Sequence, residues 1–265
     1  MKEFFGIGGY ERPAEGFLSW QHLLFVSILM AVMIGLAVFL GLKNRNKEER
    51  VKNKVLIWAA ILINSFELLK IVVLCIRDNS FEPILRTLPL FLCSIQLITI
   101  PLAAFTKGRI KEAALDFVFI FGILGAILGT YGAAQNYNAY PVLSMDNVVS
   151  GITHSIAGFS SLYIGFSKMV SMKPKNIFIS FAILLSFCIL AYIANVTIPY
   201  NYMFLMRGDG TPYDIFYNLV NGNAVLYPII VVMLFVIYVS LFYLIFYLIK
   251  KRREKKTEQE NQTKA

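Results

Sequence analysis

The chain has 265 residues, of which 57% are hydrophobic and 15% are charged, and its mean hydropathy is +0.64. Soluble domains carry roughly 25% charged residues, so this composition excludes an ordinary soluble protein and indicates an integral membrane protein. The net charge of +9 does not indicate nucleic-acid binding, because the basic residues form short clusters between apolar runs instead of one exposed face. We therefore expect membrane lipids, and no nucleic acid, as partners.

Seven apolar runs each approach the ~20 residues that a helix needs to cross a bilayer. They cover residues 22–42, 55–76, 84–105, 114–134, 148–168, 177–198 and 224–249. The runs lack the alternation typical of barrel strands, so they predict an all-α bundle of seven transmembrane helices in one domain, residues 1–250. Residues 251–265 are rich in Lys, Glu and Gln and predict a disordered basic tail.

Lys and Arg are unequally distributed among the loops between these helices. Nineteen of the 25 lie in the tail and in the loops after the first, third and fifth helices, whereas five lie in the N-terminal segment and the alternate loops. Cytoplasmic loops are enriched in Lys and Arg, so the count places the N-terminus outside and the C-terminus in the cytoplasm. We expect a multi-pass protein of a cell membrane, namely a bacterial plasma membrane, and the oligomeric state stays open.

The fourth predicted helix contains GILGAILGTYG, with glycines at 122, 125, 129 and 132. Small residues at such spacings let the backbones of neighbouring helices approach closely. The stretch therefore predicts a helix-packing face.

Polar side chains gather at one depth of the predicted bundle. At 1.5 Å of rise per residue, Cys93 lies roughly 8–14 Å and His154 about 9 Å below the outer surface, with Gln96 one turn deeper than Cys93 on the same face. The same outer half holds Asn64, Glu67, Lys70, His22 and Asn195. Ionisable groups inside a bilayer usually face a functional cavity, so this layer predicts one.

Each of these residues alone has a structural explanation. A free Cys is often a small buried hydrophobe, a single His can be a hydrogen-bonded interior residue, and Glu67 with Lys70 can form one neutralised ion pair. The combination favours chemistry, because an imidazole can take the proton of a thiol and create a nucleophilic thiolate. We therefore predict Cys93 and His154 as catalytic residues.

Other residues would support this pair. Gln96 or Asn195 would donate to an oxyanion, and Arg207 in the outer loop is a candidate contact for a phosphate head group, although an exposed Arg is more often solvated. His22, Asn64, Glu67 and Lys70 would line or orient the cavity. The three cysteines and two histidines show no zinc-site spacing, and we expect neither a metal nor a cofactor.

The segment LPLFLC, which ends at Cys93, resembles the LPLHLC motif of the YwaF-like integral membrane proteins. THSIAG around His154, YNYMFL at 200–205 and WQHLLF with His22 are similar to further segments of that family, and the resemblance covers about residues 18–249. The family is related to a vertebrate transmembrane acyltransferase that remodels phospholipids through a cysteine-centred active site. The resemblance implies that Cys93 is an acyl-bearing nucleophile and His154 a general base.

Two positions depart from this family pattern. Phe91 stands where the family often has His, and Ser94 stands where an acidic residue is common. Both departures remove groups that would assist proton transfer.

Two functional hypotheses follow. In the first, the protein is a lipid acyltransferase or acyl hydrolase that uses the Cys/His pair in an outward-facing cavity. In the second, it is a transporter or small-ligand-binding protein with Glu67 and Lys70 as its polar site, although no inverted repeat is visible in the sequence. A purely structural membrane protein is the third option.

Overall fold

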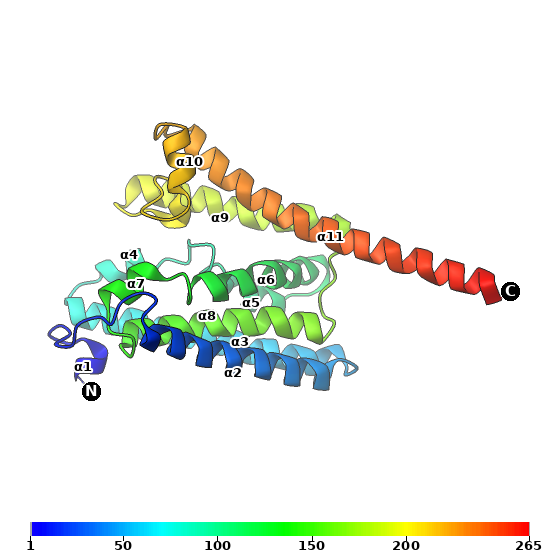
Figure 1. Ribbon diagram of the computed structural model, residues 1–265, viewed down its shortest axis with the longest axis horizontal. Coiled ribbons are helices and arrows are strands. Elements are labelled where there is room, and N and C mark those ends of the chain that lie inside the picture. The colour runs from blue at the N-terminus through cyan, green and yellow to red at the C-terminus, as the bar shows by residue number, and fades with distance from the viewer. Residues whose placement is uncertain (1, 265) are drawn as a thin grey trace. The chain divides into compact units, whose positions relative to one another are not determined.

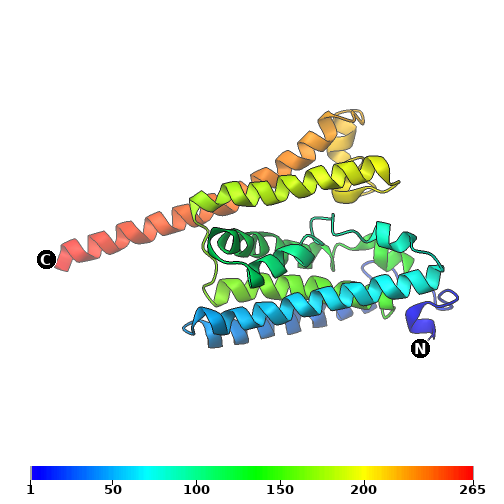
Figure 2. The ribbon, with the colours of Figure 1, turned by 180° about the vertical axis from the view of Figure 1, so that it is seen from behind.

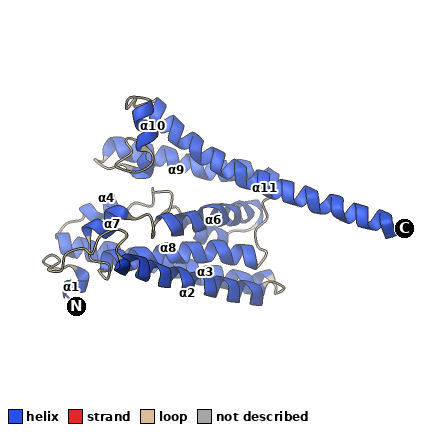
Figure 3. Ribbon diagram, in the orientation of Figure 1, coloured by secondary structure: helices blue, strands red, loops and turns tan. Residues whose placement is uncertain are grey.

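The computed structural model describes residues 2–264, and for residue 253 and residues 255–264 it describes the backbone alone. Within this range the regular elements are helices, as Figure 3 shows. In chain order they are α1 (Lys2–Phe5), α2 (Trp20–Asn44), α3 (Glu49–Asp78), α4 (Glu82–Arg86), α5 (Gln96–Phe105), α6 (Gly108–Leu128), α7 (Ala134–Ala139), α8 (Met145–Phe166), η1 (Pro174–Asn176), α9 (Ile177–Thr197), η2 (Tyr202–Phe204), α10 (Asp214–Leu219) and α11 (Leu226–Lys264). The all-α class predicted from the continuous apolar runs is confirmed.

The chain divides into two compact units, one ending at Val170 and the other starting at Ser171, where the sequence predicted a single domain. The first unit contains α1 to α8, and the second contains η1, α9, η2, α10 and α11. In the second unit α9 packs against α11, and the Ser180 hydroxyl lies 2.9 Å from the Tyr243 hydroxyl. The helix α11 continues to Lys264, so the tail expected to be disordered has a helical backbone. Its Lys, Arg, Glu and Gln residues are good helix formers, which explains the continuation.

Among residues 2–264, four helices are long and apolar enough to cross a membrane by length and composition. They are Trp20–Asn44, Glu49–Asp78, Pro174–Thr197 and Leu226–Arg252, and they cover the runs expected at 22–42 and 55–76 and most of the runs at 177–198 and 224–249. The runs at 114–134 and 148–168 fall largely on α6 and α8, which have 21 and 22 residues and so extend for about 30 Å. Many residues of these two helices are buried inside the unit. Seven crossings and the orientation of the chain stay predictions.

The helix expected over residues 84–105 is interrupted. The structure has the short helix α4, an irregular segment over 87–95, and then α5. Pro89 fixes its own φ and removes a donor, which disfavours a continuous helix here. Ser94 Oγ accepts a hydrogen bond from the Phe91 amide at 3.0 Å and so stabilises the turn that leads into α5. Non-helical backbone at membrane depth is tolerated where protein buries it or where it lines a cavity, and this segment carries Cys93.

The helix α8 is the centre of the first unit and packs against α2, α3 and α6 (Figures 1 and 2). Close contacts occur where glycines remove the side chain between two backbones. A Cβ added at Gly122 of α6 would lie 2.5 Å from the Ala157 carbonyl of α8, and one added at Gly41 of α2 would lie 2.5 Å from Phe166 Cβ. The packing role predicted for the glycine-rich stretch is thereby confirmed at Gly122.

Candidate functional site

The structure brings Cys93 and His154 together. The side chains of Cys93 and His154 lie close enough to interact electrostatically with each other. Cys93 comes from the turn that precedes α5, His154 comes from the middle of α8, and both are partly buried. The interrupted helix and the central helix of the first unit therefore supply one residue each to this pair.

The backbone of α8 determines which ring nitrogen of the neutral His154 imidazole carries the proton. His154 Nδ1 lies 2.8 Å from the carbonyl oxygen of Ser150, one turn earlier in the helix. A carbonyl oxygen can only accept, so Nδ1 carries the proton and donates it to this bond. The other ring nitrogen, Nε2, keeps its lone pair and can accept a proton from the thiol. This is the arrangement required of a general base beside a nucleophile.

Two glycines of α6 provide the space for this pair. A Cβ added at Gly125 would lie 3.4 Å from Cys93 Cβ, and a Cβ added at Gly129 would overlap Cδ2 and Nε2 of His154. The two glycines are four residues apart and so lie one above the other on α6. The glycine-rich stretch thus serves the site as well as helix packing, which its spacing alone did not reveal.

The polar face of α3 lies close to the pair. Lys70 Nζ forms an ion pair with Glu67 Oε1 at 2.6 Å, and the Lys70 charge interacts electrostatically with both Cys93 and His154. Asn64 donates to the carbonyl oxygens of Ala60 and Leu97, at 2.9 and 3.1 Å, and so ties α3 to α5. Of this predicted face, Lys70 is the residue whose charge interacts electrostatically with the Cys/His pair.

Gln96 is fully buried at the first residue of α5. Its Oε1 lies 3.1 Å from the Thr99 hydroxyl, whereas its Nε2 has no hydrogen-bond partner. The prediction that Gln96 follows Cys93 on one face agrees with the backbone, in which the Gln96 amide donates to the Cys93 carbonyl at 3.3 Å.

His22 uses both of its ring nitrogens in structural hydrogen bonds. The Leu18 amide donates to Nδ1 at 3.1 Å, and Nε2 donates to the Thr130 carbonyl at 3.1 Å. The ring also packs on Tyr137, with centroids 3.8 Å apart. His22 therefore fastens the start of α2 to the residue after Gly129, and it does not present a free nitrogen to the Cys/His pair.

Asn195 and Arg207 belong to the second unit, where their side chains are engaged. Asn195 Oδ1 accepts from the Tyr202 amide at 2.6 Å, and Asn195 Nδ2 donates to the Tyr202 carbonyl at 3.0 Å. Arg207 Nε pairs with Asp209 Oδ1 at 2.5 Å, and its side chain is largely exposed. Asn195 thus holds the loop that contains the YNYMFL segment, and Arg207 pairs with its neighbour in that loop.

Sequence reasoning missed a buried ion pair at the end of α3. Arg77 forms two hydrogen bonds to the Asp146 carboxylate, of 2.7 and 3.2 Å, and Tyr10 donates to the same carboxylate at 2.5 Å. Burial, followed by the hydrogen bond to Asp146, raises the pKa of Tyr10 above its usual value. An Arg at the end of an apolar helix and an Asp in the first turn of another were the available signals, but neither identified its partner.

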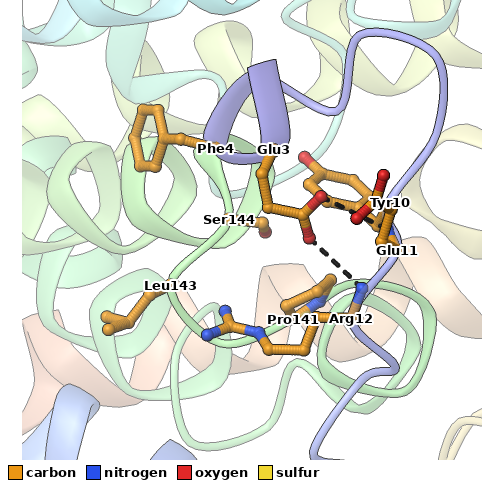
Figure 4. A pocket seen from close by; sticks show the side chains of 8 residues that line it. All are labelled: Glu3, Phe4, Tyr10, Glu11, Arg12, Pro141, Leu143 and Ser144. Atoms are coloured by element: carbon orange, nitrogen blue, oxygen red, sulfur yellow. Dashed lines mark hydrogen bonds between the residues drawn. The ribbon is translucent and has the colours of Figure 1, made fainter. Parts of the chain in front are cut away.

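The N-terminal segment also borders a pocket of about 500 Å³, shown in Figure 4. The Glu3 side chain lines this pocket and accepts hydrogen bonds from the backbone amides of Glu11 and Arg12, at 3.3 and 3.2 Å. None of the predicted site residues lines this pocket. Among residues 2–264, no group of three His, Cys, Asp or Glu side chains could hold a metal ion.

The comparisons with known proteins identify a family. A model of the TMEM164 family matches residues 17–246, a range that includes Cys93, Gln96 and His154. No curated protein and no solved structure matches the chain. The match supports the membrane family expected from LPLFLC, although it does not confirm the YwaF name. Because the matched range covers most of the chain, the protein belongs to the TMEM164 family of multi-pass membrane proteins.

Proposed function

We propose that this protein transfers or hydrolyses acyl groups of membrane lipids, with Cys93 as the nucleophile and His154 as the general base. The observation that carries the proposal is the proximity of the Cys93 thiol to an imidazole whose Nδ1 lies 2.8 Å from the Ser150 carbonyl oxygen. A thiol needs an adjacent base to react as thiolate, and this base is orientated before any substrate binds.

The chemistry has two halves. First, His154 Nε2 takes the thiol proton while Sγ attacks the carbonyl carbon of a lipid ester; the ester C–O bond breaks, and the leaving alcohol takes the proton from His154. A thioester then remains on Cys93. Second, His154 removes a proton from an acceptor hydroxyl or from water, whose oxygen attacks the thioester, and the sulfur leaves and regains its proton. A lipid acceptor makes the reaction a transfer, and water makes it a hydrolysis.

An apolar groove in the first unit supports a lipid as substrate. It has a volume of about 450 Å³ and lies between α2, α3 and α8, with Met33, Trp58 and Phe159 in its lining. Apart from Ser155, its lining side chains are apolar, and neither Cys93 nor His154 is among them. A groove of this size and composition suits an acyl chain better than a polar solute.

Transport by the Glu67/Lys70 pair is the second candidate. The two side chains neutralise each other at 2.6 Å within one helix, so the pair needs no further ion. The proximity of Cys93 and His154 is the more specific observation. Flux of a solute in proteoliposomes that survives Cys93→Ala and is lost in Glu67→Gln would favour transport.

The test of acyl chemistry uses the purified full chain and an alkyne-bearing phospholipid. We expect thioester labelling of the wild-type protein that hydroxylamine removes, no labelling of Cys93→Ala, and strongly slowed labelling of His154→Ala. The variants Cys75→Ala and Cys188→Ala are matched controls and should label as wild type. Undiminished labelling of Cys93→Ala would remove Cys93 from the mechanism. A cell membrane, specifically a bacterial plasma membrane, is the location that we propose for this activity.

A further inference from the structure

We propose that the Gln96 side-chain amide donates a hydrogen bond to the oxygen that becomes negatively charged when Cys93 attacks a carbonyl carbon. This inference rests on the acyl chemistry proposed above. It assigns an oxyanion donor, which the Cys/His pair alone does not supply.

The Gln96 side chain holds an unused donor in a fully buried place. Gln96 has no exposed surface, and its Nε2 has no hydrogen-bond partner. The Thr99 hydroxyl, which also lies 3.2 Å from the Ile95 carbonyl, engages only one end of the amide. Whichever way the amide is turned, at least one N–H therefore stays unused. Buried polar groups are nearly always paired, because an unpaired one destabilises the fold, so this exception requires an explanation.

The Gln96 amide also lies one turn from the nucleophile. Gln96 follows Cys93 by three residues in one helical turn, which the Gln96 amide closes onto the Cys93 carbonyl at 3.3 Å. Side chains three residues apart in a helical turn lie on the same face. The donor thus comes from the same face of the same turn as the nucleophile, and Gly125 of α6 leaves room beside Cys93.

The alternative donor, the Asn195 amide, is occupied. Asn195 was the other amide predicted for this role, but its oxygen and nitrogen both bond to the backbone of Tyr202. An amide with both ends bonded in the folded protein has to break a bond before it can donate to a substrate. Gln96 has no such bond to break at Nε2.

The proposed step conserves atoms and electrons. As the Cys93 Sγ–C bond forms, the thiol proton passes to His154, and the π electrons of the carbonyl move onto its oxygen. Gln96 Nε2–H donates to that oxygen, and the bond strengthens as negative charge develops. When the C–O bond to the leaving alcohol breaks, the charge returns to the carbonyl and the hydrogen bond weakens. Donors that act on developing charge in a water-poor site accelerate acyl transfer strongly.

The experiment compares two reactions of the same thiol in the full chain. A long-chain p-nitrophenyl ester acylates Cys93 through an oxyanion, whereas iodoacetamide alkylates it by displacement at a saturated carbon, where no oxyanion forms. In Gln96→Met we expect acylation to slow by about 100-fold, the effect of losing one oxyanion donor, while alkylation is unchanged. Rates in Cys93→Ala are subtracted to remove the contributions of the other cysteines.

Stability provides a second, independent measurement. Met fills the Gln96 site without leaving an unpaired donor, so Gln96→Met should keep or raise the melting temperature, as should the second variant, Gln96→Leu. The matched control is Asn195→Leu, which should lower the melting temperature while the ratio of acylation to alkylation stays that of the wild type.

Three results would overturn the proposal. If acylation and alkylation fall together in Gln96→Met, the residue only positions Cys93, and if neither falls, it donates nothing. If the ester acylates Cys93→Ala as fast as the wild type, the proposed function itself fails, and the Gln96 proposal fails with it. The first two results leave acylation dependent on Cys93, so they are distinguishable from the third.

Discussion

Position 129 requires a glycine because a side chain there would occupy the space of the His154 imidazole, and not because the backbone needs a conformation special to glycine. The residue ends α6 with φ −79° and ψ −4°, a conformation open to any amino acid, yet an added Cβ would overlap the His154 ring. The sequence spacing predicted only helix packing for this glycine, because a sequence does not show which side chain of a neighbouring helix lies against a given residue. The contact makes Gly129 a residue that positions the imidazole of the proposed base.

Substitution of Gly129 tests this assignment. In Gly129→Ala the methyl group would displace His154 from Cys93, and a misplacement of about 1 Å can slow catalysis by roughly 100-fold. We expect a loss of this order in Cys93 acylation, measured with the lipid ester. The matched control is Gly35→Ala in α2, where no atom lies within 4 Å of the added Cβ. This variant should keep full activity and equal or higher stability, since Ala favours a helix by about 1 kcal/mol over Gly. Wild-type activity in Gly129→Ala would contradict the assignment.

The polar residues His22 and Asn195 were predicted near the site but have structural roles. A sequence shows a polar side chain in an apolar run, but it does not show the backbone groups that bind it. Here the His22 ring binds backbone groups of Leu18 and Thr130, and the Asn195 amide binds those of Tyr202. Backbone groups are the same at every position, so these partners leave no signal in the sequence.

Among the elements, the end of α3 and the start of α8 are joined by Arg77 and Asp146. The two side chains are 14% and 9% exposed, and Tyr10 adds the N-terminal segment to the same carboxylate. Removing one member of such a pair leaves a charge buried without its partner. The cluster therefore holds the segment before α2 against the ends of α3 and α8.

Stability measurements check this role of Arg77. In Arg77→Met we expect a loss of about 3 kcal/mol, the lower end of the cost of breaking a buried pair. The stability of Arg77→Lys should lie between those of Arg77→Met and the wild type, because Lys keeps the charge but not the two parallel hydrogen bonds. The control is Arg86→Met, since the Arg86 pair with Glu82 is half exposed and contributes at most about 1 kcal/mol. Equal melting temperatures for Arg77→Met and Arg86→Met would contradict the assignment.

For the whole molecule, the number of crossings and the positions of the termini are linked. An N-terminus outside and a C-terminus in the cytoplasm require an odd number of crossings, whereas the four most apolar helices alone would place both ends on one side. Among the described helices, α6 and α8 have the length to add crossings, and α5, with 10 residues, completes one only together with the segment around Cys93.

Thiol labelling measures this topology directly. In a background without native cysteines, Glu11→Cys should react with a membrane-impermeant maleimide in intact cells. Lys47→Cys and Glu254→Cys should react only after the cells are permeabilised. Reaction of Glu11→Cys and Glu254→Cys on the same side would require an even number of crossings and would reject the seven-helix prediction.

The sequence by itself determined the membrane class, the all-α composition and four of the long helices, because apolar length is a local property of the chain. It also predicted Cys93 and His154 as one pair, because loop charges and helical rise relate distant residues to a common depth. Only the tertiary structure decided that the two lie close together, that Ser150 and Gly129 position the imidazole, and that Gln96 rather than Asn195 keeps a donor unused. These outcomes depend on which helix faces are neighbours, and that is fixed by packing between segments distant in the chain.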